Sequence, residues 1–272
     1  MSTQPSSEPS SEFLVEMRRI SKTFNPGTIS EVRLFHDFNL SLRRGSFTSV
    51  VGSNGSGKTT ILNILCGSTV PDAGEVVVGG RESSTLSECR HSKFIGRVFQ
   101  DPAAGTCPKL TVLENLALAD NKGKRFGLTG SVCKNRIDFY RSQLELLKLG
   151  LEDKLNQPVA SLSGGQRQAL ALLICTMTPI SLLILDEHTA ALDPKSSETV
   201  MDLTDRFVRE KHLTALMVTH NLKYAAAYGD RLLMMHRGNI VLDVCGQEKE
   251  RLGVRGLTEK FDEISLEDGN SV

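Results

Sequence analysis

The chain has 272 residues, enough for one large domain with a sizeable hydrophobic core. Its 32 lysines and arginines are matched by 32 aspartates and glutamates, so it has no net basic field to hold a polyanion over a large area. Nucleic acid is therefore not expected as a main ligand.

The start of the chain and its cysteines predict the compartment. Residues 1–12 are rich in Ser, Pro and Glu, which predicts a disordered tail, and they lack the basic and apolar pattern of a secretion signal. No apolar run approaches the roughly 20 residues that span a bilayer. The six cysteines are scattered singly, without the spacing of a zinc site or the density of a disulfide scaffold. We expect a cytosolic protein with reduced thiols.

The first third of the chain predicts mainly strands. Residues 13–20 and 32–42 favour antiparallel strands, and residues 46–52 favour a buried central strand. A helix is predicted from Lys58 to a C-cap at Gly67, followed by strands at 75–80 and 94–100. The largely alternating apolar positions of the second strand are Val32, Leu34, Phe38, Leu40 and Leu42.

The sequence changes character between about residues 104 and 177. Thr111 and Glu114 have the spacing of a capping box at the start of a helix. Residues 133–150 predict another helix, and the apolar residues expected largely on one face are Ile137, Tyr140, Leu144, Leu146 and Leu147. We interpret this stretch as a mostly helical lobe inserted into an α/β core.

The strand and helix alternation then returns. Strands are predicted at 181–187, 214–220, 231–238 and 239–244, with a helix at 195–210 and a short helix after residue 220. The unbroken apolar run Leu182–Leu185 suits a parallel strand covered on both faces. The prediction is one α/β domain over residues 13–245, with a mixed sheet whose central strands are parallel and N-terminal antiparallel strands. Residues 246–272 form an extension, expected to be a charged surface helix.

The sequence "GSNGSGKT" at residues 52–59 matches the P-loop pattern G-x-x-x-x-G-K-[ST]. It lies between a predicted strand and a predicted helix, which is the context the motif requires. Glycines let backbone N–H groups surround phosphate oxygens, the lysine reaches the β- and γ-phosphates, and the final hydroxyl ligates Mg²⁺. The residues predicted to bind nucleotide here are Gly52, Ser53, Asn54, Gly55, Ser56, Gly57, Lys58, Thr59 and Thr60.

A second stretch, "LLILDE", supplies carboxylates at the end of a predicted buried strand. Asp186 would lie at the carboxyl end of the strand, where open α/β sheets bind ligands, and could hold Mg²⁺ through water. Glu187 follows directly and could accept a proton from the water that attacks the γ-phosphate.

A third motif, "LSGGQ" at residues 162–166, completes a set that resembles the ATP-binding subunits of ABC transporters. The likeness extends from about residue 13 to residue 245. Independently of the family, Ser163, Gly164 and Gly165 at a helix start offer a hydroxyl and N–H groups to an anion. In the family, this signature loop, here including Gln166, closes over the γ-phosphate bound by a second subunit. The resemblance therefore implies a head-to-tail dimer that traps ATP.

The same resemblance implies roles for further residues. Gln100 corresponds to the glutamine that contacts Mg²⁺ and the attacking water, and His220 corresponds to the histidine that hydrogen-bonds the γ-phosphate. Asp193 corresponds to the loop residue that crosses the dimer interface, and Phe24 to the aromatic residue that stacks on adenine. The resemblance thus implies Glu187, His220, Gln100 and Lys58 as catalytic, with Thr59, Gln100 and Asp186 as Mg²⁺ ligands.

One residue departs from the family pattern. His188 follows the catalytic glutamate, where many members carry proline. We expect this substitution to be neutral, and we expect no metal other than Mg²⁺.

The resemblance also implies partners. The second cassette is a copy of this chain or a paralogue, and a separate integral membrane permease is expected because this sequence shows no spanning segment. Residues 100–119 resemble bacterial importer ATPases that accompany binding proteins of the aromatic-amino-acid type. We expect a peripheral subunit on the cytoplasmic face of the inner membrane, working in uptake of an amino acid or a similar solute with an extracytoplasmic binding protein. An exporter ATPase and a non-transport ATPase of iron–sulfur assembly remain alternatives.

Overall fold

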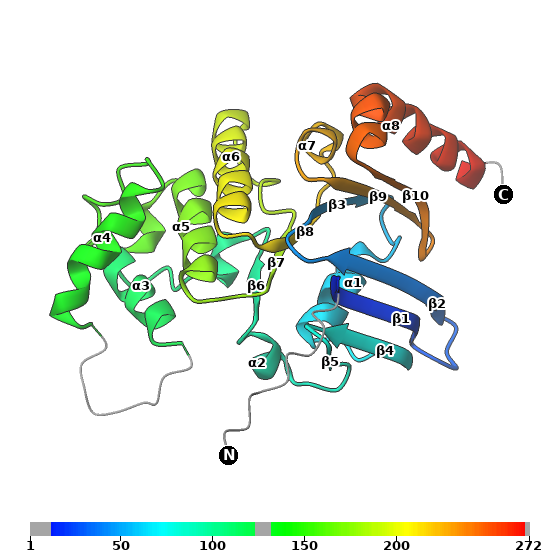
Figure 1. Cartoon of the computed structure of the whole chain (residues 1–272), viewed down its shortest axis with the longest axis horizontal. Helices are drawn as coiled ribbons and strands as arrows, with labels where there is room; N and C mark the ends of the chain where they lie inside the picture. Colours follow the sequence, from blue (N-terminus) through cyan, green and yellow to red (C-terminus); the bar gives the residue numbers. More distant parts are fainter. Residues whose placement is uncertain (1–11, 123–131, 270–272) are drawn as a thin grey trace, which may run out of the picture.

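The computed structural model describes residues 12–122 and 132–269 (Figure 1). The predicted tail at residues 1–12 therefore lies outside the described residues, apart from Glu12. Two sheets with helices packed between and around them make up the described part.

The larger sheet has six strands in the order β10-β9-β3-β8-β7-β6. The strands from β9 to β6 run parallel, and β10 is antiparallel to β9. Leu182 to Leu185 are fully buried, as the unbroken apolar run predicts. The mixed sheet with parallel central strands is thus confirmed. Its strands are β3 (Phe47–Gly52), β6 (Ile95–Val98), β7 (Leu182–Asp186), β8 (Thr214–Val218), β9 (Arg231–His236) and β10 (Asn239–Cys245).

The smaller sheet is antiparallel, with the order β2-β1-β4-β5. It consists of β1 (Phe13–Phe24), β2 (Val32–Arg43), β4 (Ala73–Val78) and β5 (Arg81–Glu82). The alternation expected in β2 is confirmed from Phe38 onward but is wrong for Val32, which is exposed. Asp37 has a φ of +52°, and the pairing of β2 with β1 shifts register along this stretch. Phe35 is therefore the residue buried at the start of the strand.

Helix α1 (Lys58–Cys66) lies between the two sheets. One apolar cluster joins its buried residues to β1, β2 and β4 on one side and to β3, β7 and β8 on the other. The helix ends as predicted at Gly67, whose φ of +76° forms a left-handed C-cap. Helix α2 (Glu88–His91) is a single short turn that precedes β6. Packing on both sides fixes where the start of α1 points.

The other face of the large sheet is covered by helices (Figure 1). These are α3 (Val112–Asp120), α4 (Ile137–Glu145), α5 (Gly164–Met177) and α6 (Pro194–Glu210), with short 3₁₀ turns at Pro102–Ala104, Lys134–Arg136 and Val159–Ser161. The capping box is confirmed, because Thr111 and Glu114 each accept a hydrogen bond from the other's backbone N–H. The prediction for Leu146 is wrong. It is 44% exposed because its backbone is still helical and two residues of helix turn it away from the face of Tyr140, Leu144 and Leu147, which are buried.

The last two helices of the chain pack against β9 and β10. Helix α7 (Leu222–Ala227) and helix α8 (Gly246–Gly269) share a cluster with the outer face of these strands. Helix α8 is bent at Gly253, whose φ of +55° and ψ of −171° are not helical. The Lys249 ammonium donates to the carbonyls of Tyr228 and Gly229, and burial lowers its pKa to about 8. The predicted charged helix thus has one face that is part of the core.

None of the helices within residues 12–122 and 132–269 is long and apolar enough to cross a membrane.

The docking of α8 generates a stability prediction. Leu257 is fully buried among residues of β3, β9, β10 and α7, so Leu257→Ala should lower the free energy of unfolding by about 2–5 kcal/mol. Val254→Ala is the matched control, because Val254 lies on the exposed side of α8 and should change stability by less than about 0.5 kcal/mol. Chemical denaturation measures both. Equal destabilisation by the two variants would show that α8 is not docked through Leu257.

Candidate functional site

The loop at residues 52–59 connects β3 to α1 and closely approaches the strands around it. Gly52 has a φ of +154°, and a Cβ there would lie 2.2 Å from the carbonyl oxygen of Met235 on β9. Gly57 has a φ of +104°, and a Cβ there would lie 2.7 Å from the ring of Phe35 on β2. A side chain at Gly52 would force the loop away from β9 of the larger sheet, and one at Gly57 would force it away from β2 of the smaller sheet. The glycines of the motif therefore permit one compact loop shape.

The loop and the helix that follows offer donors for an anion. The N-cap of α1 is Gly57, which has no side chain to cap the helix, and the first turn contains no acidic residue. The first N–H groups of α1 and the positive end of its dipole therefore face the loop. Ser56 adds a buried hydroxyl that has no hydrogen-bond partner among the residues that the structure describes. A phosphate group supplies the acceptors that these donors require.

Lys58 is buried at the base of the loop. Its ammonium donates to the carbonyl oxygens of Gly52 and Ser53, at 2.8 and 2.9 Å. Burial lowers the pKa of Lys58, and the carboxylate of Glu187 opposes that shift. The side chain therefore places a positive charge under the loop and close to the carboxylate that faces it.

A cavity of about 370 Å³ brings the loop together with residues from β1 and β2 and from just after β7 and β8. Glu187 and His220 reach it from just after the carboxyl ends of β7 and β8, and Phe24 reaches it from the end of β1. Parallel strands end at one edge of a sheet, which explains why residues so distant in sequence meet here. The lining residues are Phe24, Val32, Leu34, Asn54, Gly55, Ser56, Gly57, Lys58, Thr59, Thr60, Glu187 and His220.

Glu187 and His220 form a pair at the edge of this cavity. Nε2 of His220 lies 2.8 Å from Oε1 of Glu187. Glu187 has a φ of +48°, in the left-handed region that a residue with a side chain rarely adopts. Its N–H donates to the carbonyl of Val218 at 2.9 Å, which holds this backbone in place. Backbone strain of this kind is found at functional sites, and Glu187 lines the cavity from this turn.

Of the predicted Mg²⁺ ligands, Thr59 lines the cavity, whereas Asp186 and Gln100 are not among its lining residues. Asp186 ends β7, directly before Glu187, and Gln100 is exposed just after β6. Hydroxyl, carboxylate and amide oxygens are the ligand types that Mg²⁺ prefers, so this donor set fits the ion. Oδ2 of Asp186 accepts a hydrogen bond of 2.6 Å from Nη2 of Arg97.

The residues of the signature sequence lie elsewhere. They begin α5, which Figure 1 shows among the helices on the far side of β6 and β7 from α1. Ser163, Gly165 and Gln166 line a second cavity of about 210 Å³ together with Lys195 and Ser196 of α6. This second cavity and the P-loop cavity have no lining residue in common. Within one chain, the structure does not bring the two glycine motifs together.

The signature residues also have structural roles in their own chain. Ser163 caps α5 by accepting a hydrogen bond from the Gln166 N–H, and Oε1 of Gln166 accepts one from the Ser163 N–H. A Cβ on Gly165 would lie 2.9 Å from Cβ of Ser196, so the glycine allows α5 to pack closely on α6. Asp193 caps α6 by accepting from the Ser196 N–H. Hydrogen bonding with Ser196, through its hydroxyl first and its N–H second, lowers the pKa of Asp193.

His188 is buried behind the Glu187 turn. Its Nε2 lies 3.1 Å from the hydroxyl of Thr204 on α6. Burial lowers its pKa to about 4, so the ring is neutral at physiological pH. His188 therefore adds no charge beside the carboxylate of Glu187.

Two polar residues at this site were not identified from the sequence. Arg97 holds Asp186, and Gln168 on α5 donates to the Phe99 carbonyl just before Gln100. The signal for Arg97 is a charged residue within the apolar strand "FIGRVF". Gln168 carries no such signal, because a glutamine inside a helix is usually a surface residue.

Comparisons with known proteins agree with this geometry. The family profile described as ABC transporter matches residues 35–190, more than half of the chain. A tyrosine transport ATP-binding protein of Clostridioides difficile is 44% identical over 250 residues, covering 92% of this chain and 99% of that protein. An energy-coupling factor transporter ATP-binding protein of Enterococcus faecalis is 33% identical and covers 86% of this chain and 80% of its own length.

A solved structure gives the same fold. It is a dimeric ATP-binding cassette in a post-hydrolysis state, bound to ADP and Pi, with 29% sequence identity and a TM-score of 0.71. The match covers 85% of this chain and 98% of that structure. Fold, sequence and cavity therefore agree, and the chain belongs to the ABC transporter family as an ATP-binding cassette, a class of ATPases.

Proposed function

We propose that this cassette hydrolyses Mg-ATP to power uptake of an aromatic amino acid through a separate permease. The cavity that sets Lys58 and the P-loop opposite Glu187 and His220 supports the hydrolysis. The solute class is supported by the relative named for tyrosine transport, which is similar to this chain along nearly its full length. The resemblance of residues 100–119 to importers of the aromatic-amino-acid type points the same way.

Binding would begin at the loop. Backbone N–H groups of residues 52–59 and the hydroxyl of Ser56 would donate to phosphate oxygens, and Lys58 would neutralise their charge. Phe24, which lines the same cavity, offers an aromatic face to adenine. Thr59, Asp186 and Gln100 would hold Mg²⁺, which neutralises charge on the phosphates.

Hydrolysis would use the pair at the edge of the cavity. A water oxygen bonds to the γ-phosphorus while the bond from that phosphorus to the bridging oxygen breaks, giving ADP and phosphate. Glu187 accepts the water proton, and the contact with His220 orients its carboxylate. A second hydrogen bond from His220 to the γ-phosphate is the role expected from the family.

A second copy would complete each site. Because Ser163, Gly164, Gly165 and Gln166 lie away from the P-loop of their own chain, they are available to a nucleotide bound by a partner. Two cassettes packed head to tail would then share two nucleotides, with Asp193 near the interface. A paralogous cassette could supply the second half in the same way.

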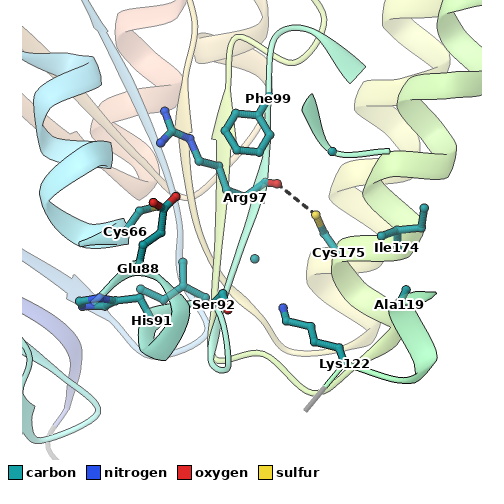
Figure 2. A pocket seen from close by; sticks show the side chains of 13 residues that line it. Cys66, Glu88, His91, Ser92, Arg97, Phe99, Ala119, Lys122, Ile174 and Cys175 are labelled. Carbon is teal, nitrogen blue, oxygen red and sulfur yellow. Dashed lines mark hydrogen bonds between the residues drawn. The ribbon is translucent and has the colours of Figure 1, made fainter. Parts of the chain in front are cut away.

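The permease would dock on a groove between the core and the α3–α5 helices (Figure 2). The groove has a volume of about 250 Å³ and is lined from the core by α2 and β6 and from the other side by Ala119, Lys122 and Ile174. An amphipathic helix can bind by laying its apolar face into a groove, so we propose a helical segment of the permease as the partner of this one. The proposal places the cassette on the cytoplasmic face of the inner membrane, in a system with an extracytoplasmic binding protein.

Purification from detergent-solubilised membranes of the native host tests this assignment. We expect a permease with several spanning segments to accompany the cassette, together with a binding protein that releases an aromatic amino acid on denaturation. Recovery of the cassette with cytosolic iron–sulfur assembly proteins, or with a permease that drives efflux, would contradict the uptake function. Only the proposed ATP hydrolysis would then remain.

Replacing the proposed base should separate binding from hydrolysis. Glu187→Gln keeps the size of the side chain but cannot accept the water proton, so turnover should fall by at least about 10²-fold. ATP should still bind, and the variant should form an ATP-stabilised dimer. Radiolabelled ATP hydrolysis and light scattering measure the two effects, with the exposed Glu259→Gln as the control. A variant that remains monomeric in saturating Mg-ATP would contradict the shared-site arrangement.

A bulky, positively charged side chain in the signature loop should block the nucleotide site shared by two chains but not ATP binding by one chain. Ser163→Arg should spare ATP binding by the isolated chain and abolish ATP-dependent dimerisation and turnover, because the loop is not part of its own chain's cavity. Ser142→Arg adds the same charge to an exposed position on α4 and should behave as the wild type. Loss of ATP binding in the monomeric Ser163→Arg protein would place the signature loop in its own nucleotide site.

A further inference from the structure

Arg97 is the charged residue of β6, a strand whose other residues are buried. Its guanidinium contacts two elements at once. Nη2 donates to Oδ2 of Asp186 at 2.6 Å, and Nη1 donates to Oδ1 of Asn63 on α1 at 2.9 Å. Both members of the ion pair are largely withdrawn from solvent, with side chains 15% and 16% exposed for Arg97 and Asp186. An ion pair so shielded is screened less by salt than one on the surface.

The surroundings hold the guanidinium in one place. The Phe99 ring centroid lies 4.9 Å from Cζ of Arg97, at a distance typical of a cation–π contact. The Arg97 carbonyl accepts a hydrogen bond from the Cys175 thiol on α5, and Figure 2 shows the side chain extending from β6 toward the helix that carries Cys66. Burial raises the pKa of the Cys66 thiol to about 11, and the nearby guanidinium opposes this shift. Arg97 is therefore fixed at both its backbone and its side chain.

We infer that Arg97 is a positioning residue that fixes the Asp186 carboxylate for Mg²⁺ binding. The inference rests on the proposed role of Asp186 as a Mg²⁺ ligand. Arg97 lines the groove of Figure 2 and is not among the residues that line the P-loop cavity. Any effect of Arg97 on a bound ion would therefore pass through the side chains that it holds, Asp186 and Asn63.

The geometry explains why arginine suits this position. Its planar guanidinium carries several donors in fixed directions, so one side chain can bind Asn63 and Asp186 together. The end of β7 is thereby held in a fixed position relative to helix α1. With Oδ2 held by Nη2, rotation of the Asp186 carboxylate is restricted. Residues that hydrogen-bond metal ligands in this way typically change metal affinity by about 10- to 100-fold when they are mutated.

The experiment measures the affinity for a non-hydrolysable ATP analogue by calorimetry, once in excess EDTA and once in saturating Mg²⁺. Arg97→Met keeps the length of the side chain and removes its donors. We expect the affinity in Mg²⁺ to fall by about tenfold or more, while the affinity in EDTA stays within about twofold of the wild type. Arg209→Met, which removes an exposed ion pair with Asp205 on α6, is the matched control and should leave both affinities unchanged.

Arg97→Lys separates position from charge and protects the test if Arg97→Met folds poorly. Lysine keeps the positive charge but cannot bridge Asn63 and Asp186 with a planar fork. We expect a loss of affinity in Mg²⁺ that is smaller than for Arg97→Met yet clearly measurable. Wild-type affinity in Arg97→Lys would show that charge alone suffices, and tighter Mg²⁺-dependent binding in Arg97→Met would show that Arg97 competes with the ion. Either result overturns the inference.

Asp186→Asn in the same assay distinguishes this inference from the proposed function. A loss for Asp186→Asn without a loss for Arg97→Met would overturn the role of Arg97 and leave Asp186 as a Mg²⁺ ligand. Unchanged Mg²⁺-dependent binding in Asp186→Asn would remove the basis for both.

Discussion

The parallel pairing of β3, β7 and β8 is the constraint on which the nucleotide site depends. Buried parallel strands must end at one edge of the sheet, so the P-loop, Glu187 and His220 leave their strands side by side. Helix α1 starts at this edge because it follows β3 through the P-loop. Its packing between the two sheets fixes its direction. The chemistry of the site is thus a consequence of core packing, and the polar residues need only short loops to reach one another.

The two glycine motifs answer different physical needs within one chain. In the P-loop, glycines allow close contact with Met235 and Phe35 and leave N–H groups for an anion. In the signature loop, Gly165 allows α5 to pack on Ser196, and the hydroxyl of Ser163 already caps its own helix. A ligand of the signature loop must therefore approach the capped helix start from outside the chain. This favours a shared site between two chains over a second site within one.

Motifs with strict local geometry could be predicted from the sequence, and features that depend on distant contacts could not. The P-loop, the capping box at Thr111 and the buried strand β7 each follow from a few neighbouring residues, and all three elements form where expected. The register of β2 could not be predicted, because a left-handed residue at Asp37 interrupts the alternation and buries Phe35 in place of Val32. A charged residue within the apolar strand β6 marks Arg97 as unusual, but its partner Asp186 lies 89 residues away, and nothing in the strand indicates that contact.

The turn after β7 shows how the fold holds a strained backbone at Glu187. A residue with a side chain at positive φ costs about 1–2 kcal/mol, and Glu187 is such a residue. Proline at the next position, common in the family, would restrict this turn through its ring. Here the next residue is His188, which instead anchors the turn through its side chain, buried against Thr204 on α6. Because burial lowers the pKa of His188 to about 4 and keeps the ring neutral, this contact holds the turn without placing a second charge beside Glu187.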